Sequence, residues 1–220
     1  MKKLYKHKVE GKPNLIVVFQ SMNAHLYAPE NKNKFELENT FSRLNPEYSD
    51  LLFINDDTRT SHSKVGGFYL HSEPVDNICS DLNKLSRQYK KILCTGISAG
   101  GFAAILFGSL CSVDVVAAIN PQTTLFDFQT GGLITMGKTP PMFDNSKYYD
   151  LKPHINNKTN YYISEAAVTS PYEECSNQKK LHHVYMHDHI REFQNVHFRS
   201  DLNATYSCLK DLLSANDFTK

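Results

Sequence analysis

The chain has 220 residues, of which 24 are basic and 23 acidic, so its formal net charge is +1. This length is typical of one domain with a sizeable core. The balance of charges argues against a basic surface that binds nucleic acid, and no apolar run is long enough to span a membrane. Five scattered cysteines without a CxxC pair, and a basic start without the apolar segment of a secretory signal, lead us to expect a cytoplasmic protein with reduced thiols.

Short apolar runs rich in β-branched residues alternate with helical patterns along the chain. The predicted elements are, in chain order, strand 14–19, strand 51–54, helix 76–89, strand 92–95, helix 100–110, strand 113–119, strand 160–164, strand 195–199 and helix 203–213. Continuously apolar strands are typical of a sheet that is buried on both faces. The sequence therefore predicts a three-layer α/β fold with a mainly parallel central sheet.

The segment 126–150 interrupts this alternation, because it contains a Gly-Gly pair at 131–132, a Pro-Pro pair at 140–141 and several other turn residues. We interpret residues 1–220 as a single domain and this segment as an insertion. Ligands of parallel α/β folds bind at the carboxyl edge of the sheet. The insertion could form a cap over that edge.

The residues around Ser98 carry the most informative motif of the chain. Positions 96–100 read Gly-Ile-Ser-Ala-Gly, between a predicted strand and a predicted helix. In such a G-x-S-x-G turn the serine has strained dihedral angles, and a side chain at either glycine would collide with neighbouring backbone. Ser98 is therefore predicted to be a nucleophile, and the N–H of Ala99 is predicted to bind an oxyanion. The alternative is an ordinary serine in a glycine-rich turn.

This motif and the strand order resemble the α/β-hydrolase fold. A narrower resemblance covers about residues 51–122, through Phe-Ile-Asn-Asp-Asp at 53–57, Gly-Gly-Phe-Ala-Ala-Ile-Leu-Phe-Gly at 100–108 and Asn-Pro-Gln at 120–122. These stretches are similar to compact α/β-hydrolase-like proteins of bacterial surface-polysaccharide loci, some of which are sugar O-acetyltransferases. The resemblance implies a serine esterase or O-acyltransferase that acts on a glycan or small ester. It implies acetyl-CoA as the acyl donor of a transferase and no required cofactor.

The histidine expected from the order Ser, Asp/Glu, His is missing from its usual place after the last strand. Residues 200–203 read Ser-Asp-Leu-Asn, and the amide of Asn203 cannot take a proton from a serine. A dense cluster, His187-Asp188-His189, lies just upstream. We predict His189 as the base and Asp188 as the acid.

Other residues remain alternatives for these two roles. Glu165 could be the acid, and His187 could be the base. His25 and His62 are further candidates for the base, because they follow the first two strands at the catalytic edge of the sheet. His197 falls inside a predicted strand, which favours a structural role.

The second oxyanion donor of this fold comes from the loop after an early strand, so Ser21 or Met22 is the candidate here. No metal site is predicted, because His183 and His187 lack the HExxH arrangement of zinc enzymes. Two functions remain open. The first is serine-dependent acyl transfer or ester hydrolysis, including polysaccharide O-acetylation. The second is a catalytically degenerate binding or assembly protein of surface-glycan synthesis, which the missing histidine favours.

Overall fold

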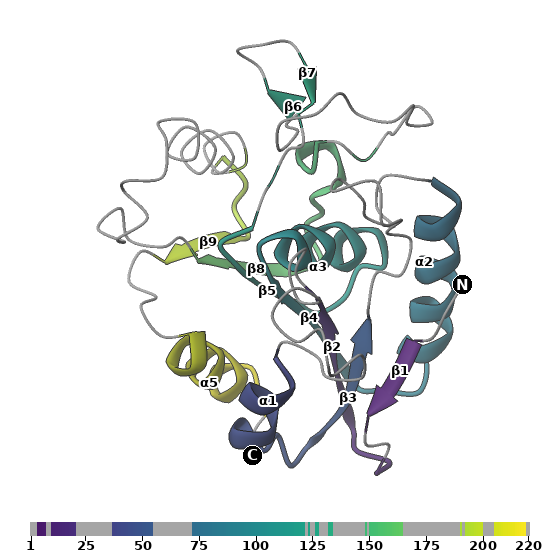
Figure 1. The fold of residues 1–220 in the computed structure, drawn as a ribbon, viewed down its shortest axis with the longest axis vertical. Helices are drawn as coiled ribbons and strands as arrows, with labels where there is room; N and C mark the ends of the chain where they lie inside the picture. Colours follow the sequence, from purple (N-terminus) through teal and green to yellow (C-terminus); the bar gives the residue numbers. More distant parts are fainter. Residues whose placement is uncertain are drawn as a thin grey trace, which may run out of the picture.

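The computed structural model describes residues 4–7, 10–20, 37–54, 72–121, 123, 126–127, 132–133, 148, 150–164, 190, 192–199 and 205–218. Its main sheet has seven strands in the order β1-β3-β2-β4-β5-β8-β9 (Figure 1). The strands are β1 (Leu4–His7), β2 (Asn14–Phe19), β3 (Ser49–Ile54), β4 (Lys91–Ile97), β5 (Val115–Ile119), β8 (Asn160–Ser164) and β9 (Val196–Arg199). β1 is antiparallel to β3, and the other six strands are parallel, so the expected mainly parallel sheet is confirmed.

Helices cover both faces of the sheet (Figure 1). They are α1 (Glu38–Leu44), α2 (Ser72–Ser86), α3 (Ala99–Leu110), the short 3₁₀ helix η2 (Lys152–His154) and α5 (Thr205–Ala215). Apolar residues of α2 and α3 pack against one face, and those of α1 and α5 pack against the other. The three-layer arrangement predicted from the sequence is therefore confirmed.

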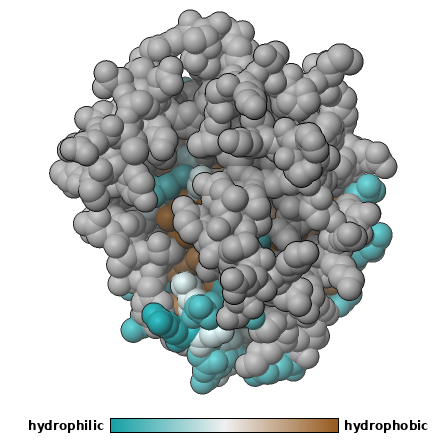
Figure 2. Space-filling view, viewed as in Figure 1, coloured by the Kyte–Doolittle hydropathy of each residue, from teal (hydrophilic) through white to brown (hydrophobic). Residues whose placement is uncertain are grey.

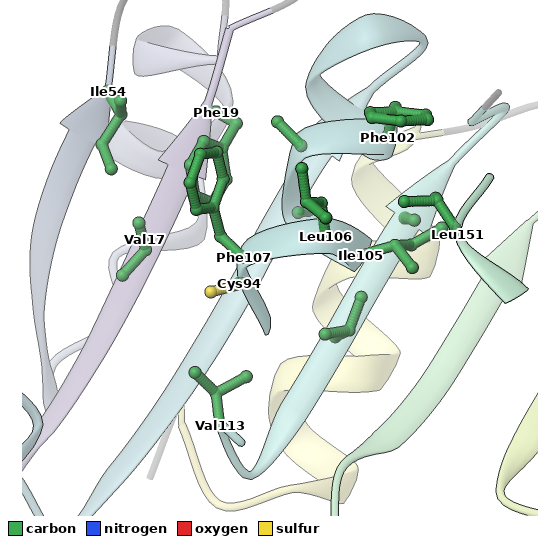
Figure 3. Close-up of a cluster of buried hydrophobic side chains, with 14 of the residues drawn as sticks. Val17, Phe19, Ile54, Cys94, Phe102, Ile105, Leu106, Phe107, Val113 and Leu151 are labelled. Carbon is green, nitrogen blue, oxygen red and sulfur yellow. The ribbon is translucent and has the colours of Figure 1, made fainter. Parts of the chain in front are cut away.

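The strands are apolar throughout because consecutive side chains point to opposite faces, both of which are buried. In β2, Val17 and Phe19 pack in the core beneath α2 and α3, whereas Val18 packs in the core beneath α1 and α5. The ring of Phe19 stacks on Phe107 of α3 with centroids 5.1 Å apart (Figure 3). Residues 99–109 of α3 are all buried, which explains why this helix is apolar on every side.

Figure 2 shows one face of the molecule, on which described hydrophilic residues lie at the edge of the view. In the space-filling view, apolar residues of the described part are visible as a narrow strip, and hydrophilic residues follow the lower edge (Figure 2). Among the described residues, Tyr48 is the large apolar side chain that stands out, with 47% of its surface exposed. No helix in this part of the chain is long and apolar enough to cross a membrane.

The predicted strands and helices are all present; strands 14–19 and 160–164 have the predicted bounds, and the other elements have shifted ends. α2 begins and ends earlier than the predicted 76–89, and α5 begins and ends later than the predicted 203–213. β1 and α1 occur where the sequence predicted no element. The sequence prediction therefore located the central strands and the helices beside them, and it missed elements nearer the start of the chain.

The start of β5 shows why one strand is shorter than predicted. The prediction began at Val113, whereas β5 begins at Val115. Ser112 has a φ of 51°, and the Val113 N–H donates to the carbonyl oxygen of Gly108 at 3.0 Å. The bond closes the last turn of α3, so Val113 belongs to the end of the helix rather than to the strand.

The two residues that flank the predicted insertion, Thr123 and Leu151, are in contact with each other. The Leu151 N–H donates to the carbonyl oxygen of Thr123 at 3.0 Å, just beyond the end of β5. Between these residues, β6 (Phe126–Asp127) and β7 (Gly132–Leu133) form an antiparallel pair that is separate from the main sheet. In Figure 1 this pair stands at the top of the view, the direction in which the arrows of β2 and β3 point. A cap over the sheet edge and the single-domain interpretation stay predictions.

Three side chains at the amino edge of the sheet bind the segment after α5. Asn14, Ser49 and Lys91 are the first residues of β2, β3 and β4, and they are register partners. Asn14 Nδ2 donates to the carbonyl oxygen of Asp217 at 3.0 Å. Ser49 Oγ donates to the carbonyl oxygen of Phe218 at 3.0 Å, and Lys91 pairs with the Asp217 carboxylate at 3.4 Å. These contacts, which we call the amino-edge clamp, tie residues 216–218 to three central strands.

A buried carboxylate organises the same edge of the sheet. Asp50 of β3 is 1% exposed and accepts hydrogen bonds from the backbone N–H groups of Glu10 and Lys12 at 2.9 and 3.4 Å. It also accepts a hydrogen bond from the Tyr89 hydroxyl at 2.9 Å. Burial, followed by this hydrogen bond and the charge of Asp50, raises the pKa of Tyr89 to about 12. The phenolate is unfavourable there because it would face a carboxylate.

Replacing Tyr89 with Phe should therefore weaken the alkaline pH dependence of stability. The unfolded chain releases the Tyr89 proton near the ordinary pKa of 10, whereas the folded chain keeps it until about pH 12. The free energy of unfolding falls as the pH rises through this window. Urea unfolding between these two pH values should show a smaller fall for Tyr89→Phe, which also loses about 1 kcal/mol at neutral pH with its hydrogen bond. Tyr48→Phe is the control, and an unchanged slope in Tyr89→Phe would contradict the argument.

Candidate active site

Ser98 lies on a one-residue turn between a central strand and a helix. β4 ends at Ile97 and α3 begins at Ala99. β4 has parallel neighbours on both sides, β2 and β5, so the turn stands in the middle of the carboxyl edge of the sheet. Ser98 has a φ of 53° and a ψ of −117°, a conformation that non-glycine residues rarely adopt. The strained turn predicted from the sequence is present.

The two glycines of the motif allow backbone segments to touch. A Cβ atom on Gly96 would lie 2.4 Å from the backbone carbon and oxygen of Gly100. A Cβ atom on Gly100 would lie 2.4 Å from the carbonyl oxygen of Phe19, at the end of β2. These separations are far below van der Waals contact, so the collision predicted from the sequence is confirmed at both positions.

Backbone hydrogen bonds fix the serine between its neighbours. The Ser98 N–H donates to the carbonyl oxygen of Ile119 at 2.9 Å, and the Ser98 carbonyl oxygen accepts from the Phe102 N–H at 3.0 Å. An α-helix leaves the N–H groups of its first turn without partners inside the helix. Ala99 is the first residue of α3, which suits the predicted role of its N–H as an oxyanion donor.

The end of β5 completes the described part of the site. Asn120 follows β5 with a φ of 43°, and its N–H donates to the carbonyl oxygen of Ser164 at 2.7 Å. Pro121 lies against the first turn of α3, where a Cβ atom on Gly101 would be 2.9 Å from the Pro121 Cβ. The hydroxyl of Ser164, at the end of β8, is buried and has no hydrogen-bond partner among the described residues. Sequence reasoning did not assign Asn120 or Ser164 to the site, although Asn before Pro after a strand is a turn signal.

The other predicted site residues cannot be placed beside Ser98. Ser21, Met22, Asp188 and His189 all lie outside the described residues, as do the alternatives His25, His62, His187 and Glu165. The last described residue before the predicted oxyanion loop is Gln20, whose N–H donates to the carbonyl oxygen of Ile54 at 3.2 Å. The predicted acid, base and second oxyanion donor therefore stay predictions.

His197 lies inside β9, as the sequence suggested. Its ring stacks on Tyr162 with centroids 5.3 Å apart. Across the sheet, His197 pairs with Tyr162 of β8, which pairs with Ala117 of β5, which in turn pairs with Thr95 of β4. β9 is three strand spacings away from β4, which amounts to about 14 Å. A base must come within about 3 Å of the serine oxygen, or act through one water. His197 is therefore not the base for Ser98.

The connection after β9 departs from the usual pattern of this fold. β9 ends at Arg199 and α5 begins at Thr205. The residues between them are Ser-Asp-Leu-Asn-Ala, without a histidine. The predicted role of Ser98 as a nucleophile therefore requires a proton acceptor from another part of the chain.

The described residues contain neither a metal site nor, at the opposite edge of the sheet, a second candidate active site. No group of three or more His, Cys, Asp or Glu side chains in this part of the chain could hold a metal ion. A hollow of about 540 Å³ lies at the amino ends of β8 and β9, where Asn160 and Asn195 line it. This hollow is at the edge opposite Ser98, so it does not belong to the candidate active site.

Comparison with known proteins supports the fold. No protein-family model matches the chain, and no curated protein matches its sequence. The capsule O-acetyltransferase of Neisseria meningitidis serogroup A matches with a TM-score of 0.58 and 15% identity, over 98% of this chain and 94% of that one. A sugar hydrolase from Lactococcus lactis matches with a TM-score of 0.56 and 15% identity, over 97% and 92%.

A third similar structure is a glycosylation-associated protein complex from Streptococcus agalactiae. It matches with a TM-score of 0.57 and 13% identity, over 96% of this chain but 44% of that one, so the chain spans less than half of its length. These matches and the strand order show that the chain has the α/β-hydrolase fold. At identities this low, the similarity shows the fold and not the reaction.

Replacing Gly100 with Ala should disrupt the turn. The new Cβ atom would collide with backbone rather than with a side chain, so no rotamer change relieves it, and we expect a loss of about 3 kcal/mol in the free energy of unfolding. Gly11→Ala is the control, because a Cβ atom added at Gly11 would have no described atom within 4 Å and would meet only the cost of the positive φ of Gly11. It should lose only about 1 kcal/mol. Urea unfolding measures both, and equal losses would show that the close contact with Phe19 does not matter.

Proposed function

We propose that this protein is an enzyme that uses Ser98 for acyl transfer or ester hydrolysis on a glycan or a small ester. The observation that carries the proposal is the conformation of Ser98, with a φ of 53° on a one-residue turn at the centre of the sheet edge. Backbone strain of this kind costs of order 1–3 kcal/mol and clusters at active sites. The strain is consistent with a serine that must project alone toward a substrate.

The proposed reaction begins when Ser98 Oγ attacks the carbonyl carbon of an acyl donor while a histidine takes its proton. The Ala99 N–H stabilises the negative oxygen, together with an N–H from Ser21 or Met22. One such donor contributes about 10²- to 10³-fold to the rate. Collapse of the intermediate expels the leaving group and leaves the acyl group on Ser98. A sugar hydroxyl or water then accepts the acyl group.

A glycan acceptor and an acetyl-CoA donor are the finer part of the proposal. They are supported by the names of similar structures, a capsule O-acetyltransferase and a sugar hydrolase. A transferase differs from a hydrolase chiefly in how well it excludes water. The segment that leaves at Thr123 and returns at Leu151, beside the end of β5, is proposed to cover the site.

A second candidate function is a catalytically degenerate protein that binds or assembles with a partner of glycan synthesis. The observation that favours it is the connection between β9 and α5, which has no histidine. The similarity to part of a glycosylation-associated complex is consistent with this function. Chemical labelling of Ser98 distinguishes the two candidates.

The first prediction for the site concerns the nucleophile. Ser98→Ala should abolish labelling by a fluorophosphonate probe, with little change in stability. It should also lower both acyl transfer from acetyl-CoA and hydrolysis of p-nitrophenyl acetate by about 10³-fold or more. Ser42→Ala, at an exposed position of α1, is the matched control and should keep full labelling. Labelling that persists in Ser98→Ala would rule out this nucleophile. A wild type that resists labelling and shows no activity would favour the second candidate.

The second prediction concerns the base. If His189 takes the serine proton, His189→Ala should lower kcat/KM by about 10²- to 10⁴-fold, and the acid limb of the pH profile should disappear with it. His197→Ala is the control and should keep full activity, since β9 holds His197 away from Ser98. Full activity in His189→Ala would contradict the assignment. The same assay on His187→Ala, His25→Ala and His62→Ala would then locate the base.

A further inference from the structure

Two cysteines from different helices meet on the side of the molecule covered by α2 and α3. Cys79 lies in α2, and Cys111 follows the last residue of α3. Cys111 Sγ donates to the carbonyl oxygen of Cys79 at 3.9 Å, so its sulfur lies against the backbone of that residue. Neither cysteine is in a disulfide, and both are partly exposed. They are 32 positions apart in the chain, so the contact depends on the packing of α2 against α3.

The residues around Cys79 and Cys111 do not form a metal site, and they do not activate Cys111 as a single reactive thiol. Cys94 of β4 lies close to both, but it is fully buried and cannot meet a reagent in solution. The described residues hold no group of three or more side chains suited to a metal ion. The hydrogen bond to Cys79, together with burial, raises the pKa of the Cys111 thiol well above its ordinary value. Cys111 therefore keeps its proton and donates it to the carbonyl oxygen of Cys79.

We propose that Cys79 and Cys111 are a modification site, at which a small disulfide such as oxidised glutathione converts the two thiols into a reversible bond between α2 and the end of α3. The Cys111 sulfur already lies against the backbone of Cys79, and the bond requires the two sulfur atoms to close to about 2.05 Å. The bond would enclose β4, the serine turn and α3 in one covalent loop.

The chemistry balances in two exchange steps. The Cys79 thiolate attacks one sulfur of oxidised glutathione, which forms a mixed disulfide and expels one glutathione thiolate. The Cys111 sulfur then attacks Cys79 in the mixed disulfide, loses its proton to solvent and expels the second glutathione thiolate. Two protein thiols are oxidised and one glutathione disulfide is reduced. Excess reduced glutathione reverses both steps.

The test uses the full chain with Cys175 and Cys208 replaced by Ser, which leaves Cys79, Cys94 and Cys111. After incubation of the folded protein with oxidised glutathione, intact mass should fall by two hydrogen atoms. One thiol, that of Cys94, should remain to react after denaturation, and peptide mapping should join the peptides of Cys79 and Cys111. The unoxidised mass should return with dithiothreitol.

Two matched variants in the same background locate the bond. Cys111→Ser should stop at the mixed disulfide with glutathione on Cys79, and Cys79→Ser should form no intramolecular disulfide. An unchanged mass, a stable glutathione adduct without loss of hydrogen, or a bond that includes Cys94 would each overturn the proposal. The readout is mass and not activity, so Ser98→Ala should form the same bond, and the outcome is independent of the function proposed for Ser98.

Discussion

The close contact of two backbone segments, Gly100 of α3 and Phe19 of β2, is the constraint on which the candidate site depends. Without a Cβ atom at position 100, the helix can start directly against the end of the neighbouring strand. This start gives Ser98 its positive φ and leaves the first N–H groups of α3 at the sheet edge. It also brings the end of β2 beside the turn, so the chain leaves Phe19 close to the turn that holds Ser98. One steric requirement therefore positions two parts of the predicted site.

The sequence predicted the central fold because the signals there are local. Strands 14–19 and 51–54 are buried on both faces, so their apolar character is continuous, and the serine motif needs only five adjacent residues. β1 was missed because it is a four-residue edge strand whose sequence, Leu-Tyr-Lys-His, contains no continuous apolar run. α1 was missed because Phe41 is its only buried residue, which is too little to produce a helical pattern. The start of β5 was misplaced because Val113 is apolar like the strand, and the sequence does not reveal that its N–H bonds to Gly108 at the end of α3.

Part of the candidate site was predictable because its signal is also local in the sequence. Ser98 and Ala99 follow from the motif itself, whereas the positive φ of Asn120 depends on how β5 meets β8 and α3. The proposed base and acid would come from segments distant in the sequence, and no short motif identifies which histidine could fill the role. The α/β-hydrolase fold therefore indicates where a site can lie, whereas the residues of its connections determine the function.

The amino-edge clamp has a consequence for the order in which the chain folds. Asn14 and Asp217 are separated by 203 positions, yet they form one hydrogen bond at the foot of β2. Contacts between such distant positions slow folding, because loop closure precedes any gain from them. During synthesis from the amino end, β2, β3 and β4 can align with one another long before residues 216–218 exist. The amino ends of the three central strands thus lack these partners until residues 216–218 have left the ribosome.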